Sequence, residues 1–112
     1  MNPYFRNSRN ILLGVLALSA AAFPALAEDP RAIADRAITA YNAGIDAENA
    51  GNYSDACISY RDAADRFESA IYALMGQPMQ TQDERDNIKA YADVLQEKVD
   101  LAKENARRVC NK

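Results

Sequence analysis

The stretch GNYSDACISYRDAADRF, residues 51–67, carries the pattern that decides the fold. Apolar or small residues recur every three or four positions from Tyr53 to Phe67, and the same spacing continues to Leu74. This period places the side chains along one side of an α-helix, and nowhere does it alternate as a strand would. We therefore expect a helix over about 52–75, with one cysteine, Cys57, beside its apolar line.

Two further segments show the same helical period, one at about 30–50 and one at about 82–109. Glycine and proline separate the three segments, at Gly51-Asn52 and at Gly76-Gln77-Pro78. Such residues favour turns and interrupt helices, because glycine is conformationally permissive and proline lacks an N–H donor. The chain after residue 27 therefore divides into three helices joined by short turns.

The starts of the outer helices are also marked in the sequence. Asp29-Pro30 offers a capping side chain followed by a first-turn proline, and Thr81 precedes Glu84 at the spacing of a capping box. Each helix has two adjacent apolar lines, so each must contact two neighbours, and short connections make successive helices antiparallel. The expected fold class is all-α, an antiparallel three-helix bundle.

Gly44 lies in the middle of the first helix, where glycine costs about 1 kcal/mol relative to alanine. Close approach of a neighbouring helix would compensate for this cost. We expect bulky side chains of the second and third helices to fill the space: Tyr53, Tyr60, Phe67, Leu74, Leu95 and Val99.

Residues 1–27 have the pattern of a secretory signal peptide. Arg6 and Arg9 precede an uncharged run from Ile11 to Phe23, and Ala25-Leu26-Ala27 supplies small residues at a cleavage point. A transmembrane helix needs about 20 apolar residues, so the run is short for a membrane anchor, although a retained anchor is the alternative. We expect a signal peptide over 1–27, a three-helix domain over 28–112, and a periplasmic or secreted location.

Composition excludes several classes of function. The chain has no histidine and no tryptophan, and loss of the signal peptide would change its net charge from −3 to about −5. An acidic domain is not expected to bind nucleic acid or an anionic membrane surface. Acidic pairs at helical spacing have basic residues interleaved with them, which is typical of a solvated helix face. We expect no catalytic residue, metal or cofactor, and hence a protein that is not an enzyme.

Cys57 and Cys110 are the two cysteines, and an even number in a small exported domain predicts a disulfide. A bridge between them would close a loop of about 54 residues and contribute roughly 4 kcal/mol. Antiparallel helices bring both cysteines to the same end of the bundle. If residue 75 lies opposite residue 82, however, Cys110 falls about 15 Å too far along. Either the third helix crosses at an angle and unwinds near its end, or the bridge is intermolecular; two unpaired thiols are the remaining alternative.

The hairpin of the first two helices resembles a tetratricopeptide repeat. The likeness rests on small residues and aromatics at matching positions: Ala43, Gly44, Gly51, Asn52, Tyr53, Ala56, Tyr60 and Ala63. Over nearly all of residues 28–112 the chain is more similar to the microtubule-interacting and trafficking domain. That resemblance rests on the run from Asp46 to Tyr53, on Ala56 to Ala63, and on five positions of the third helix: Arg85, Ile88, Lys89, Tyr91 and Leu95. It implies a three-helix bundle with a groove that accepts a segment of another protein.

We therefore expect an exported module that binds another protein as an accessory subunit, a toxin-immunity or inhibitor protein, or a chaperone. A structural protein acting as a disulfide-linked dimer is the alternative, so monomer and dimer both stay open. Candidate contact residues are the cluster Tyr72, Met75 and Met79 and the basic pair Arg107 and Arg108. Basic residues at the C-terminus, Arg107, Arg108 and Lys112, are also expected to meet acidic residues near the first turn: Asp46, Glu48 and Asp55.

Overall fold

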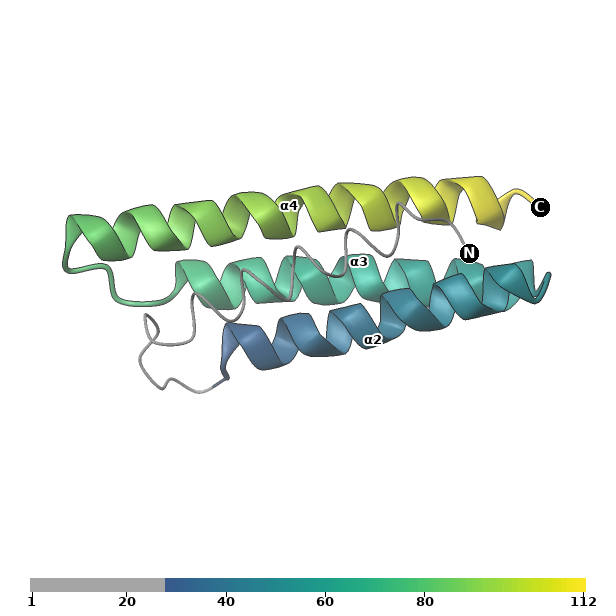
Figure 1. The fold of residues 1–112 in the computed structure, drawn as a ribbon, viewed down its shortest axis with the longest axis horizontal. Coiled ribbons are helices and arrows are strands. Elements are labelled where there is room, and N and C mark those ends of the chain that lie inside the picture. Colours follow the sequence, from purple (N-terminus) through teal and green to yellow (C-terminus); the bar gives the residue numbers. More distant parts are fainter. Residues whose placement is uncertain (1–27) are drawn as a thin grey trace.

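The computed structural model describes residues 28–112, which form three α-helices and contain no strand (Figure 1). Helix α2 covers Pro30–Asn49, α3 covers Tyr53–Met75 and α4 covers Gln82–Cys110. The expected all-α, antiparallel three-helix bundle is confirmed. Residues 1–27, the expected signal peptide, lie outside the described residues.

Local chemistry fixes where the helices begin. Asp29 caps α2 by accepting a hydrogen bond from the backbone N–H of Arg31, with Pro30 as the first helical residue. Thr81 and Glu84 form the expected capping box of α4, in which each side chain accepts from the other residue's backbone N–H. The α2–α3 turn depends on a glycine, because Gly51 has φ of 76°, which side-chain-bearing residues rarely adopt.

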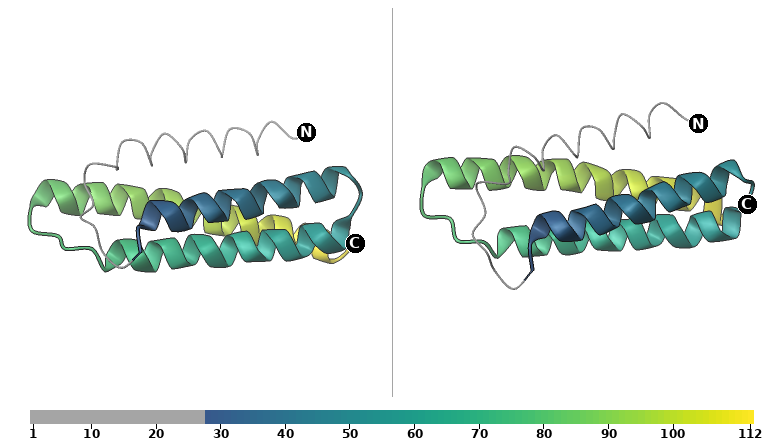
Figure 2. Two further views of the ribbon diagram at one scale, coloured as in Figure 1. Left: turned by 90° about the horizontal axis from the view of Figure 1, so that it is seen from below. Right: turned by 60° about the horizontal axis from the view of Figure 1, so that its bottom comes forward.

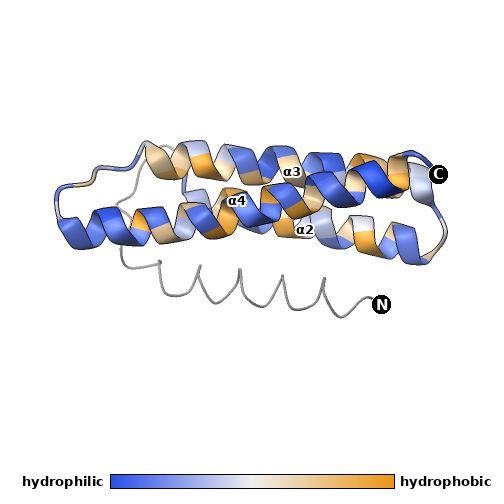
Figure 3. Ribbon diagram, turned by 90° about the horizontal axis from the view of Figure 1, so that it is seen from above, coloured by the Kyte–Doolittle hydropathy of each residue, from blue (hydrophilic) through white to orange (hydrophobic). Residues whose placement is uncertain are grey.

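Helix α3 lies between the other two helices and packs against both (Figure 1). The face of α4 turned to the viewer in Figure 3 is mostly hydrophilic, as expected for a helix whose apolar side packs inward. One cluster of buried side chains joins the three helices. Its largest fully buried members are Tyr60 and Leu74 of α3 and Tyr91, Leu95, Val99 and Val109 of α4.

Close helix approach at Gly44 is confirmed, and the ring of Tyr60 is what approaches. A Cβ atom added at Gly44 would lie 2.8 Å from two ring carbons of Tyr60, whose side chain is completely buried. One expectation for the core was wrong. Tyr53 is 37% exposed and lies beneath the Lys112 ammonium, because it is the first residue of α3 and the bundle ends there.

Gly44→Ala is expected to lower the free energy of unfolding by up to about 2 kcal/mol. Overpacking costs about 1–3 kcal/mol and exceeds the helix-propensity gain of about 1 kcal/mol. The reverse change at the exposed neighbouring position, Ala43→Gly, should also destabilise, through propensity alone. Urea denaturation of both variants measures the effect. Stabilisation by Gly44→Ala would show that Tyr60 can move aside.

The register of α4 differs from the sequence-based expectation. Cys57 and Cys110 form a disulfide within the chain, with Cα atoms 4.9 Å apart. Helix α4 remains helical to Cys110, so the expected unwinding does not occur. Instead, the segment 76–81 carries the chain outward, and the first turns of α4 extend beyond the end of α3 (Figure 1). The expected pairing of residue 75 with residue 82 was therefore wrong, because it assumed that the chain turns back immediately after the end of α3.

Candidate functional site

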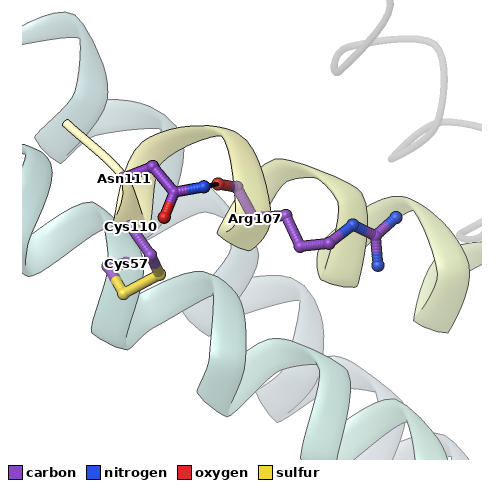
Figure 4. The surroundings of a disulfide bond; sticks show 4 residues. All are labelled: Cys57, Arg107, Cys110 and Asn111. Atoms are coloured by element: carbon purple, nitrogen blue, oxygen red, sulfur yellow. Dashed lines mark hydrogen bonds between the residues drawn. A yellow bond between two sulfur atoms is a disulfide. The ribbon is translucent and has the colours of Figure 1, made fainter.

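The C-terminal end of α4 lies beside the α2–α3 turn (Figure 2). The Cys57–Cys110 disulfide joins the first turns of α3 to the last turn of α4 there, and both cysteines are half-buried against the core. Asn111 follows the bridge and donates a hydrogen bond to the backbone carbonyl of Arg107 (2.9 Å), as Figure 4 shows. This end of the bundle is thus held covalently.

A polar network links the three helices next to the disulfide. Buried Asn105 of α4 donates from its amide to the Tyr41 hydroxyl of α2 (2.9 Å) and to the carbonyl of Leu101 (3.0 Å). Its amide oxygen accepts from Arg108 (2.8 Å). Such a network fixes the rotation of α2 relative to α4, because a rotated helix would leave buried polar groups unpaired.

Glu48 is the second centre of this network. It accepts a hydrogen bond from the hydroxyl of Tyr60 (2.8 Å) and forms an ion pair with Arg108, whose second amino group lies 2.8 Å away. The expected meeting of opposite charges is therefore found between Glu48 and Arg108. The hydrogen bond from Arg108 holds the pKa of the Glu48 carboxyl below its ordinary value, with Tyr60 acting in the same direction and partial burial opposing them.

Glu48→Gln should lower the free energy of unfolding at neutral pH by about 1–2 kcal/mol, because charge-assisted hydrogen bonds to the carboxylate are weakened. A depressed folded-state pKa contributes stability above the ordinary value of 4.5, and that stability is lost as the pH falls through the folded-state pKa. The variant should therefore lose less stability than the wild type between about pH 6 and pH 3. Glu104→Gln, at an exposed position, is the control. Parallel pH profiles for Glu48→Gln and the wild type would contradict the assignment.

A groove with a volume of about 400 Å³ runs between α3 and α4 next to the disulfide. Eight residues line it: Arg61, Ala64, Asp65, Lys103, Ala106, Arg107, Cys110 and Asn111. Its alanines are buried, whereas its charged side chains are exposed. We call it the α3–α4 groove.

Only one of the three basic side chains in this groove forms an ion pair within residues 28–112. Lys103 forms an ion pair with Glu68 (2.8 Å). Within residues 28–112, neither Arg61 nor Arg107 forms an ion pair. Figure 4 shows the Arg107 side chain extended along α4 and away from the disulfide. Two guanidinium groups thus line this groove without a carboxylate partner among residues 28–112.

A second groove, of about 360 Å³, lies between α2 and α3. We call it the α2–α3 groove; it also contains two arginines, Arg36 and Arg66. Here, however, Arg36 forms an ion pair with Glu28, and Arg66 forms one with Asp62 (2.9 Å). The two grooves are therefore similar in size and differ in whether their arginines are already paired.

The candidate contact residues fall in different places. Tyr72 and Met75 lie near the C-terminal end of α3 and are 79% and 52% exposed, whereas Met79 is half-buried and packs against the core. Arg107 lines the α3–α4 groove, but its neighbour Arg108 belongs to the Glu48 network. The structure thus separates the Tyr72 cluster from the basic pair and assigns the two arginines different surroundings.

Sequence reasoning missed Arg61 and Lys103 as residues of the groove. Arg61 lies one turn after Cys57, and Lys103 lies two turns before Cys110. A disulfide placed between those cysteines would have brought both basic residues to the same side of the bundle. The spacing of Arg61 and Lys103 from the two cysteines could thus have identified them, but only with the correct register of α4.

Within the part of the chain that the structure describes, no three histidine, cysteine, aspartate or glutamate side chains gather in a way that could hold a metal ion. Over the same residues, no helix has the length and hydrophobicity needed to cross a membrane.

Comparison of the chain with protein-family models, with curated proteins and with solved structures found no match. The helical hairpin implied by both family resemblances is present, as α2 and α3. No family model supports membership of the tetratricopeptide or the microtubule-interacting and trafficking family.

Proposed function

We propose that this protein is an exported interaction module that binds another protein of the cell envelope or the secreted fraction. The bundle is tied together by a covalent bridge and by a polar network across all three helices. A scaffold of this kind holds its surface in one arrangement, which lowers the entropic cost of binding. The signal-peptide pattern of residues 1–27 supports the proposed location.

One observation supports the α3–α4 groove as the binding surface: Arg61 and Arg107 line it without an ion-pair partner within residues 28–112. Arginine is enriched at protein interfaces, since its planar guanidinium forms several directed hydrogen bonds. A groove between two helices is also a common site for a helical or extended segment of a partner.

Both sulfur atoms are used within one chain, and residues 28–112 contain no free cysteine. A disulfide-linked dimer would therefore require this internal bond to break. We accordingly favour a module that binds its partner through noncovalent contacts.

Affinity capture from the native envelope and secreted fractions tests the proposal. The wild type is compared with Arg61→Glu/Arg107→Glu in the α3–α4 groove and with Arg36→Glu/Arg66→Glu in the α2–α3 groove. We expect a defined set of proteins that the first double variant loses and the second retains. Tyr72→Ala should also retain them. Failure of the wild type to enrich any protein would contradict the binding function, and equal enrichment by every variant would exclude this groove.

A further inference from the structure

We propose that the α3–α4 groove binds an acidic segment of the partner protein, with the guanidinium groups of Arg61 and Arg107 receiving its carboxylates. This inference rests on the proposed binding function and adds the chemistry of the partner. The distribution of ion pairs supports this inference, because the two arginines of the α2–α3 groove, Arg36 and Arg66, already form ion pairs within the chain.

The two grooves differ in how their arginines are paired. In the α2–α3 groove, carboxylates of the chain itself occupy the hydrogen-bonding edges of Arg36 and Arg66. In the α3–α4 groove, Asp65 stands one helical turn after Arg61, yet the two form no ion pair. The donors of Arg61 and Arg107 consequently remain open to carboxylates from outside the chain.

The shape of the groove suits side chains of acidic residues. The buried residues at the floor of the groove, Ala64 and Ala106, are small. The exposed side chains of Arg61 on α3 and Arg107 on α4 flank this floor. The disulfide and Asn111 lie at one end, and the Lys103–Glu68 ion pair lies toward the other. A guanidinium can donate two parallel hydrogen bonds to a carboxylate, whereas an aliphatic side chain has no oxygen to accept them.

Local charge, rather than net charge, selects this partner. With Lys103 paired to Glu68, the remaining charges in the groove are two guanidinium groups and the single carboxylate of Asp65. The chain as a whole carries a net charge of −3. Acidic segments are thus repelled by much of the surface and attracted at this groove, which makes the interaction both site-specific and sensitive to salt.

A titration of the ¹⁵N-labelled protein, purified from its native fraction, with N-acetyl-hexaglutamate tests the inference. We expect amide shifts confined to the α3–α4 groove, centred on Arg61, Ala64 and Arg107, that diminish as salt is raised. N-acetyl-hexalysine should produce no shifts there. Because each exposed guanidinium–carboxylate pair changes an affinity several-fold, Arg61→Gln/Arg107→Gln should bind the acidic peptide about tenfold more weakly. The matched double variant Arg36→Gln/Arg66→Gln should bind within about twofold of the wild type.

Four outcomes would overturn the inference: no shifts with the acidic peptide, shifts centred on the α2–α3 groove, shifts with hexalysine at the same residues, or equal shifts with inorganic phosphate. Backbone spectra of both double variants establish that they are folded, so lost binding cannot be attributed to unfolding. The proposed binding function and the acidic chemistry of the partner are tested by different outcomes. If affinity capture enriches a partner that hexaglutamate does not displace, the binding role stands and the acidic chemistry is wrong.

Discussion

Replacing both Cys57 and Cys110 with serine should lower the free energy of unfolding by about 4 kcal/mol and the midpoint of thermal unfolding by roughly 15–30 °C. The bridge joins residues 53 positions apart, so its loss returns a long loop to the unfolded chain and increases that chain's conformational freedom. A small domain has only about 5–15 kcal/mol of stability in total. Thermal and urea denaturation of the oxidised wild type and the double variant measure the difference.

Chemical reduction of the wild type should produce the same loss of stability as the double serine variant. Single variants, Cys57→Ser and Cys110→Ser, serve as the control for intermolecular pairing. The wild type should run as a monomer on non-reducing electrophoresis, whereas either single variant gains a free thiol that can form a dimer. A loss of stability below about 1 kcal/mol would mean that the polar network and core already hold this end of the bundle without the bridge.

Tyr60→Ala should lower the free energy of unfolding by about 3–5 kcal/mol, the range typical of removing a large aromatic side chain from a core. The ring of Tyr60 packs at Gly44 and lies edge-on to Tyr41, with ring centroids 5.4 Å apart. Its hydroxyl donates to Glu48, and burial together with that carboxylate raises the pKa of Tyr60, which keeps the donor protonated. Alanine at position 60 would remove the packing of the Tyr60 ring of α3 against Gly44 of α2.

Tyr60→Phe separates the two contributions, because it keeps the ring and removes the hydrogen bond. We expect a loss of about 1–2 kcal/mol for Phe, well below the loss for Ala. Tyr72→Ala is the matched control, since Tyr72 is on the same helix and 79% exposed; it should change stability by less than about 0.5 kcal/mol. Similar losses for Tyr60→Ala and Tyr72→Ala would contradict the packing described for α2 and α3.

The parts of this fold that could be predicted from the sequence depend on local chemistry. The apolar period of residues 51–67 indicated a helix, the Thr81–Glu84 capping box marked the start of another, and Gly51 marked the turn between α2 and α3. Each signal acts within a few residues of the chain. For this reason the helices, their order and their antiparallel connection followed from the sequence.

The register of α4 could not be predicted in the same way, since it depends on the path of segment 76–81 and not on any helical period. A turn that reverses at once and a turn that runs outward first are both compatible with Gly76-Gln77-Pro78. The difference of about 15 Å decides whether the cysteines meet. Arg61 and the network around Asn105 were missed for the same reason, because each depends on which residues of α3 and α4 stand opposite one another.

Site-specific photocrosslinking in living cells tests most directly whether the α3–α4 groove is the binding surface. A photoreactive p-benzoylphenylalanine is placed at Asp65, which lines that groove, and in a separate variant at Ala43, which lines the α2–α3 groove. We expect irradiation to link a discrete protein to position 65, and we expect substitution of Arg61 and Arg107 with glutamine to abolish that adduct. An adduct formed from position 43 but not from position 65, or none from either, would contradict the assignment of this groove as the binding surface.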